Sequence, residues 1–177
     1  MPSKEGIPTM QIRIAGIEPE SIVDGPGYRF SIFVQGCPHG CPECHNPETH
    51  DFEGGRLVET ADIIAHLGRN PLVRGLTLSG GEPMLKAEAL CEIAQAAKER
   101  GMNVWCYTGY TLEQIKEMND PAQQRLLSLI DVLVDGPYIA NQRSLDLLFC
   151  GSRNQRLIDM KKTREMGGVV LYNPQTW

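Results

Sequence analysis

Aromatic residues, long apolar runs and an excess of basic charge are scarce or missing in this sequence. No segment approaches the ~18 apolar residues that a membrane-spanning helix needs, so we expect no membrane partner. Lysine and arginine number 17 against 22 aspartates and glutamates, which gives a formal net charge of −5. Because nucleic-acid-binding surfaces are usually basic, we expect no nucleic-acid partner. The first ten residues lack the apolar core of a secretory signal, and we expect a cytoplasmic protein.

The chain also lacks the regular cysteine spacing of a disulfide framework. Three of its six cysteines instead share one short segment, with the spacing Cys-x3-Cys-x2-Cys. Such clustering suits a reducing compartment. The other cysteines are most simply small apolar side chains of the interior. The clustered set is Cys37, Cys41 and Cys44, and the scattered set is Cys91, Cys106 and Cys150.

The clustered cysteines can hold metal in two ways. Three thiolates on one loop can ligate three irons of a [4Fe–4S] cluster, which leaves the fourth iron open to a small molecule. Alternatively, the same thiolates and one histidine can form a closed tetrahedral zinc site. The histidines near this segment are His39, His45 and His50. The spacing favours the cluster and leaves the zinc site as an alternative.

A second motif, Ser79-Gly-Gly-Glu-Pro83, follows the apolar segment 76–78. Glycines let the backbone approach a ligand closely, so Gly80 and Gly81 are candidate binding residues. The carboxylate of Glu82 can accept hydrogen bonds from an ammonium group. The alternative is structural: Glu82 can cap a helix that begins at Pro83.

Strand and helix patterns alternate along the chain. The expected strands are 10–15, 28–34, 76–78, 103–107 and 132–134, with weaker candidates at 156–160 and 169–172. The expected helices are 60–67 with Thr60 as N-cap, 86–100, a short helix with the capping-box pair Thr111 and Gln114, and one more around 126–130.

Strand–helix units in series predict an α/β fold with a mostly parallel sheet. A closed eight-stranded barrel needs ~250 residues, so we expect one domain over residues 1–177 that forms an open, partial (β/α) barrel. Residues 1–10 and 161–177 are tails without an assigned role. The cysteine segment, Gly80 to Glu82, the Tyr107–Gly109 segment and Asp135 all follow expected strands, on the face where barrel folds place active sites.

These motifs together resemble the radical S-adenosylmethionine (SAM) superfamily. The segments Val23–Phe30, Gln35–Cys37 and Cys44–Pro47 are similar to those of the glycyl radical enzyme activases. Two further segments, Trp105–Thr111 and Asp131–Gly136, followed by Gly151–Gln155, resemble the branch that acts on the anaerobic (class III) ribonucleotide reductase. The resemblance implies an open partial barrel of the radical SAM type.

The resemblance also implies roles for single residues. Cys37, Cys41 and Cys44 would ligate the [4Fe–4S] cluster. The amino group of SAM would be held by Gly80, Gly81 and Glu82, and its adenine would lie near the backbone of Glu43, Cys44 and His45. Thr108 and Asp135 would make further SAM or cation contacts. The substrate's glycine loop would lie near Asp24, Gly25, Pro26 and Gly27.

The activity implied by the resemblance is reductive cleavage of SAM at the cluster to give a 5′-deoxyadenosyl radical. That radical would form a glycyl radical on its partner, the anaerobic ribonucleoside-triphosphate reductase. An electron donor such as flavodoxin would reduce the cluster. The alternatives are activation of another glycyl radical enzyme, of the pyruvate formate-lyase type, another small radical SAM reaction, and a zinc-binding interaction module without catalysis.

Overall fold

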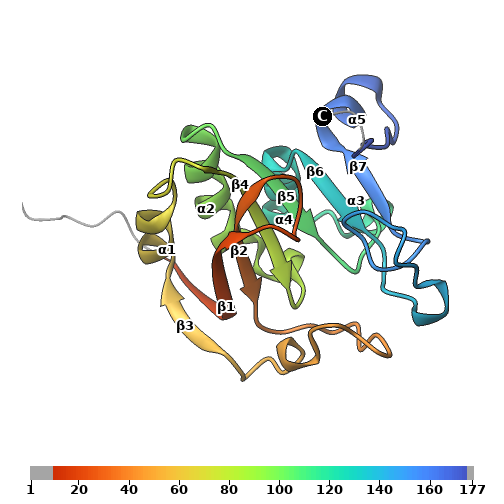
Figure 1. The fold of residues 1–177 in the computed structure, drawn as a ribbon, viewed down its shortest axis with the longest axis horizontal. Helices are drawn as coiled ribbons and strands as arrows, with labels where there is room; N and C mark the ends of the chain where they lie inside the picture. Colours follow the sequence, from red (N-terminus) through yellow and green to blue (C-terminus); the bar gives the residue numbers. More distant parts are fainter. Residues whose placement is uncertain (1–9, 175–177) are drawn as a thin grey trace, which may run out of the picture.

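A mixed sheet of seven strands runs through the computed structural model, which describes residues 10–174 (Figure 1). Its strand order is β3-β1-β2-β4-β5-β6-β7. The strands are β1 (Gln11–Ser21), β2 (Tyr28–Val34), β3 (Arg56–Glu59), β4 (Val73–Gly80), β5 (Asn103–Tyr107), β6 (Val132–Asp135) and β7 (Arg156–Asp159). Strands β2, β4, β5 and β6 are parallel. Strand β1 pairs antiparallel with β2, β3 pairs antiparallel with β1, and β7 pairs antiparallel with β6. The sheet is therefore parallel in its middle only.

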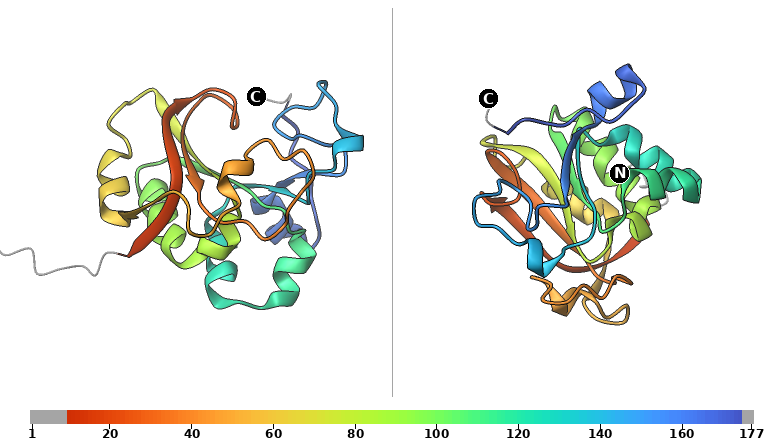
Figure 2. Two further views of the ribbon diagram at one scale, coloured as in Figure 1. Left: turned by 90° about the horizontal axis from the view of Figure 1, so that it is seen from below. Right: turned by 90° about the vertical axis from the view of Figure 1, so that its right-hand side faces the viewer.

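Helices cover one side of this sheet (Figure 2). They are α1 (Thr60–His66), α2 (Ala87–Glu99), α3 (Leu112–Met118), α4 (Pro121–Leu129) and α5 (Met160–Met166). The described residues also form the short 3-10 helices η1 (Pro47–Thr49), η2 (Pro83–Lys86) and η3 (Ala140–Gln142) in connecting segments. Helix α2 contacts both α1 and α4. Its buried face is rich in alanine, including Ala94 and Ala97, which lets the helix lie close to β4 and β5. None of the helices in residues 10–174 is both long and apolar enough to cross a bilayer.

Much of the expected secondary structure is confirmed. Strands β2 and β5 have the expected bounds, and Thr111 and Gln114 form the predicted capping box of α3. Helix α4 begins at Pro121, where the missing N–H of proline costs no helical hydrogen bond.

Several boundaries differ from the sequence-based expectation. Strand β1 continues to Ser21 because it pairs with β2 along that length. Thr60 is not the N-cap of α1: Glu59 takes that position, and the Thr60 hydroxyl donates to Glu92 instead (2.6 Å). The segment expected as a strand at 169–172 makes only an isolated bridge, and β3 and α5 were not predicted. Both missed elements are short and half-exposed, so they carry little apolar periodicity.

The four parallel strands end at one edge of the sheet, at Val34, Gly80, Tyr107 and Asp135. The cysteine segment follows β2, Gly81 and Glu82 follow β4, and Thr108 follows β5. This arrangement confirms the expectation that the candidate motifs meet at the carboxyl ends of the strands. Side chains from these strand ends can therefore build one site.

Candidate functional site

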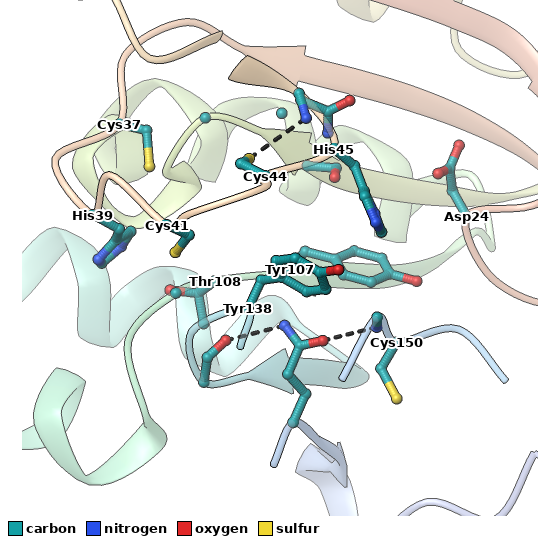
Figure 3. A pocket seen from close by; sticks show the side chains of 18 of the residues that line it. Asp24, Cys37, His39, Cys41, Cys44, His45, Tyr107, Thr108, Tyr138 and Cys150 are labelled. Carbon is teal, nitrogen blue, oxygen red and sulfur yellow. Dashed lines mark hydrogen bonds between the residues drawn. The ribbon is translucent and has the colours of Figure 1, made fainter. Parts of the chain in front are cut away.

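A cavity of about 380 Å³ opens at this edge of the sheet. That volume is in the range of small-molecule and cofactor sites. It brings together residues that the sequence analysis singled out on separate segments. Those that line it include Cys37, Cys41, Cys44, Gly80, Gly81 and Thr108. Figure 3 shows the three thiols along one wall, with Tyr107 and Tyr138 across the space from them.

The three clustered cysteines are free and half-buried at the cavity. Burial raises the pKa of the Cys37 thiol, and the negative charge of Glu82 adds to the effect. A metal that binds there must therefore displace the proton. Within residues 10–174, no three or more histidine, cysteine, aspartate or glutamate side chains converge on a point as ligands of one ion. The three thiols nevertheless share one wall of the cavity, which suits a [4Fe–4S] cluster because each of three irons takes one thiolate.

The cysteine loop is closed at its base by backbone contacts. Gly36 N donates to Thr49 O (2.7 Å) and Cys37 N donates to His50 O (3.2 Å). The buried Gln35 amide donates to the carbonyl oxygens of Glu48 (2.9 Å) and Asp51 (2.7 Å). Gln35 therefore joins the two ends of the loop, a role that its sequence position alone did not reveal.

Gly80 and Gly81 lie where no other residue fits. Gly80 has a φ of +94°, and a Cβ on it would come within 2.5 Å of Val34 N. A Cβ on Gly81 would lie 2.4 Å from Gly36 O. Gly81 N donates to Val34 O (2.7 Å), so the glycine pair lies directly against the start of the cysteine loop. Both glycines line the cavity, as a role in binding requires.

Glu82 lies in a different environment from the two glycines. Its side chain is fully buried, and Glu82 is not among the residues that line the cavity. It is the N-cap of η2, where Oε1 accepts from Met84 N (2.9 Å). The structure thus contains the capping contact that the sequence offered as the alternative.

Asp135 is also buried and also lies outside the cavity lining. Its Oδ2 accepts from Leu112 N (2.8 Å) and from the guanidinium of Arg156 (2.6 Å). Arg156 also donates to Glu113 (2.7 Å), and these hydrogen bonds raise the pKa of Arg156 and lower the pKa of the Glu113 carboxyl. Asp135 therefore joins β6 to α3 and β7, and its contact with SAM or a cation stays a prediction.

The loop Asp24–Gly27 borders the cavity through Asp24. Arg29 anchors this loop to the sheet. Its side chain is fully buried and packs on the Trp105 ring. Arg29 donates to Pro26 O (3.2 Å) and to the Thr77 hydroxyl (2.7 Å), and that hydroxyl donates to Asp24 O (2.8 Å). Burial lowers the pKa of Arg29 to about 10, so the guanidinium stays charged at neutral pH. These contacts fix the backbone of a loop that the sequence predicts to meet substrate.

The remaining wall comes from residues that the sequence analysis did not assign. Tyr138 and His45 both line the cavity, and their ring centroids lie 4.8 Å apart. Glu43, by contrast, is exposed and does not line the cavity. Cys91 and Cys106 are buried as expected, but Cys150 is half-buried and lines the cavity, which corrects its expected place in the interior. Only proximity in the fold places Tyr138 and Cys150 here.

Comparison with known proteins places the chain among iron–sulfur proteins. A family described as a 4Fe-4S single cluster domain matches residues 23–158. An anaerobic ribonucleoside-triphosphate reductase-activating protein of Vibrio cholerae is 41% identical over 145 residues, which cover 77% of this chain and 91% of that protein. Proteins of the same name from Haemophilus influenzae and Escherichia coli K12 are 37% and 34% identical over the same length, and cover 77% of this chain and 91% and 92% of their own. The solved structure of QueE from Escherichia coli is similar with a TM-score of 0.45 and 22% identity, over 58% of this chain and 54% of that one.

Proposed function

This chain belongs to the family of anaerobic ribonucleoside-triphosphate reductase-activating proteins, and we propose that it forms a glycyl radical on such a reductase. The observation that carries the proposal is the cavity at which three free cysteines, the Gly80–Gly81 pair and the Asp24 loop meet. A [4Fe–4S] cluster held by the three cysteines would supply the one electron needed for reductive cleavage of SAM, the chemistry from which hydrogen abstraction at the substrate glycine would follow.

The residues present divide this work between them. Cys37, Cys41 and Cys44 would each hold one iron, because their thiols share one wall of the cavity. Gly80 and Gly81 would bind the methionine part of SAM through their backbone, because both glycines line the cavity beside the cysteine loop. His45 would lie near the adenine and Thr108 would make a further contact with SAM, and both residues line the cavity.

The path for the substrate would run over the Asp24–Gly27 loop. Arg29 and Thr77 hold this loop through backbone carbonyls. The two residues just before this loop, Ile22 and Val23, are 68% and 74% exposed, which leaves apolar surface for a polypeptide to cover. An open partial barrel of the radical SAM type would leave such an entry free, and the parallel middle strands with the cavity at their carboxyl ends support that architecture.

Three further parts complete the proposal. We propose a single domain, because the described strands form one sheet. A flavodoxin-type donor would reduce the cluster, and the protein would act in the cytoplasm. The relatives carry the name of the ribonucleotide reductase system, so activation of a pyruvate formate-lyase type enzyme is not favoured.

The first test needs no partner protein. Anaerobically prepared protein should be brown, and after reduction it should convert SAM to methionine and 5′-deoxyadenosine in equal amounts. Both products are measured by chromatography, with unreduced protein as the control. A colourless protein that binds one zinc tightly and leaves SAM intact would establish the interaction module instead.

A further inference from the structure

The carboxylate of Glu82 has all of its acceptor positions in use within the protein. Its Oε1 accepts from Met84 N (2.9 Å) and from the Thr108 hydroxyl (2.8 Å). Its Oε2 accepts from Gly109 N (2.9 Å) and from His39 Nε2 (2.6 Å). A carboxylate has about four acceptor sites, so no position is left for a ligand's ammonium group. Because the side chain is fully buried, losing any of these donors would leave one acceptor position of a charged group without a partner.

One of these four donors comes from the cysteine loop itself. His39 lies between Cys37 and Cys41. Its ring contacts Glu82, which follows β4 and is itself hydrogen-bonded to Thr108 and Gly109 after β5. The imidazole sits against the Tyr110 ring, with centroids 4.5 Å apart. A Cβ on Gly109 would lie 2.5 Å from His39 Cδ2, so the glycine provides the space for the ring. The end of β5 is therefore shaped to receive this histidine.

We propose that Glu82 is a positioning residue, which ties the cysteine loop through His39 to the ends of β4 and β5, and does not bind the amino group of SAM. This proposal depends on the proposed function only for the identity of the metal group that the cysteine loop binds. A neutral imidazole with its proton on Nε2 is sufficient for the contact. This tether, the contact between His39 and Glu82, holds the loop in place before any metal binds. Metal binding therefore carries a smaller entropic cost for ordering the thiols.

The test compares Glu82→Gln, His39→Ala, the double variant and His39→Gln, whose amide nitrogen can donate in place of Nε2. Glu48→Gln, on an exposed carboxylate of the same segment, is the control. In metal-free protein, we expect faster hydrogen exchange of the amides from 37 to 45 in Glu82→Gln and His39→Ala alike. In the iron-loaded protein, each change should speed iron loss to a chelator by about 10- to 100-fold. The double variant should be no faster than the faster single variant, and His39→Gln should restore slow exchange and slow iron loss.

The dissociation constant of SAM separates the tether from direct binding. The tether predicts that Glu82→Gln and His39→Ala change the affinity for SAM in the same direction and by a similar factor, because both weaken the contact between Glu82 and His39. Weaker SAM binding in Glu82→Gln alone, with additive effects on iron loss, would overturn the proposal. Should Glu82→Gln fail to fold, the pair His39→Ala and His39→Gln decides it, and identical exchange in those two variants contradicts the tether. A wild-type protein that holds no iron contradicts the proposed function, while the metal-free exchange still tests the tether.

Discussion

Replacing Cys37, Cys41 or Cys44 with alanine will reduce bound iron from about four per chain to nearly none, because each thiolate holds a different iron of one cluster. The visible iron–thiolate absorption and the cleavage of SAM should disappear together in all three variants. Iron and acid-labile sulfide are measured after anaerobic reconstitution. Loss of the cluster is the largest effect that any single substitution should cause.

Two other cysteines provide matched controls for that experiment. Cys91 is buried in α2, and Cys150 lines the same cavity as the three thiols. Cys91→Ala and Cys150→Ala should both keep the cluster. Because Cys150 lines the cavity, the second variant tests whether every thiol in the cavity is a ligand or only the three on the loop. Full iron and sulfide in each of the three loop variants is incompatible with the ligand assignment.

Gly81→Ala should damage both cluster assembly and SAM binding. The added Cβ would lie 2.4 Å from Gly36 O, a backbone atom next to Cys37, so the cysteine loop must shift. Overpacking of this kind costs about 1–3 kcal/mol, and each kcal/mol lowers the melting temperature of a chain this size by ~2–4 °C. The measurements are thermal unfolding of the metal-free protein, iron content, and SAM affinity by equilibrium dialysis.

Gly168→Ala is the control, because a Cβ there meets nothing within 4 Å. The motif alone suggests that Gly81 affects SAM only, and the contact with Gly36 extends its effect to the cluster. Normal iron content and a normal melting temperature in Gly81→Ala would show that the close approach seen in the structure is not maintained.

The central parts of the site could be predicted because they are local in sequence. The spacing of Cys37, Cys41 and Cys44 predicts a set of metal ligands on one loop, and the pair Gly80 and Gly81 predicts a close approach of backbone, which the structure contains. The parallel strands follow from their alternation with helices, which also places these motifs at one edge. Local patterns therefore identified both the chemistry and its position in the fold.

The contacts that support the site could not be predicted, since they join residues far apart in the chain. His39 and Glu82 are 43 residues apart, and Arg29 is 48 residues from Thr77. A glutamate in a Gly-Gly-Glu motif reads equally well as a ligand or as a cap, and only its burial and partners decide. Cys150 reads as an interior residue until the fold places it at the cavity.

The central claim is that the substrate is a backbone glycine of the anaerobic ribonucleoside-triphosphate reductase. The most direct test is electron paramagnetic resonance of the reductase after incubation with reduced protein and excess SAM. The account predicts a doublet glycyl radical signal that vanishes when the reductase's C-terminal glycine is replaced with alanine. Formation of 5′-deoxyadenosine without any radical on the reductase would contradict it.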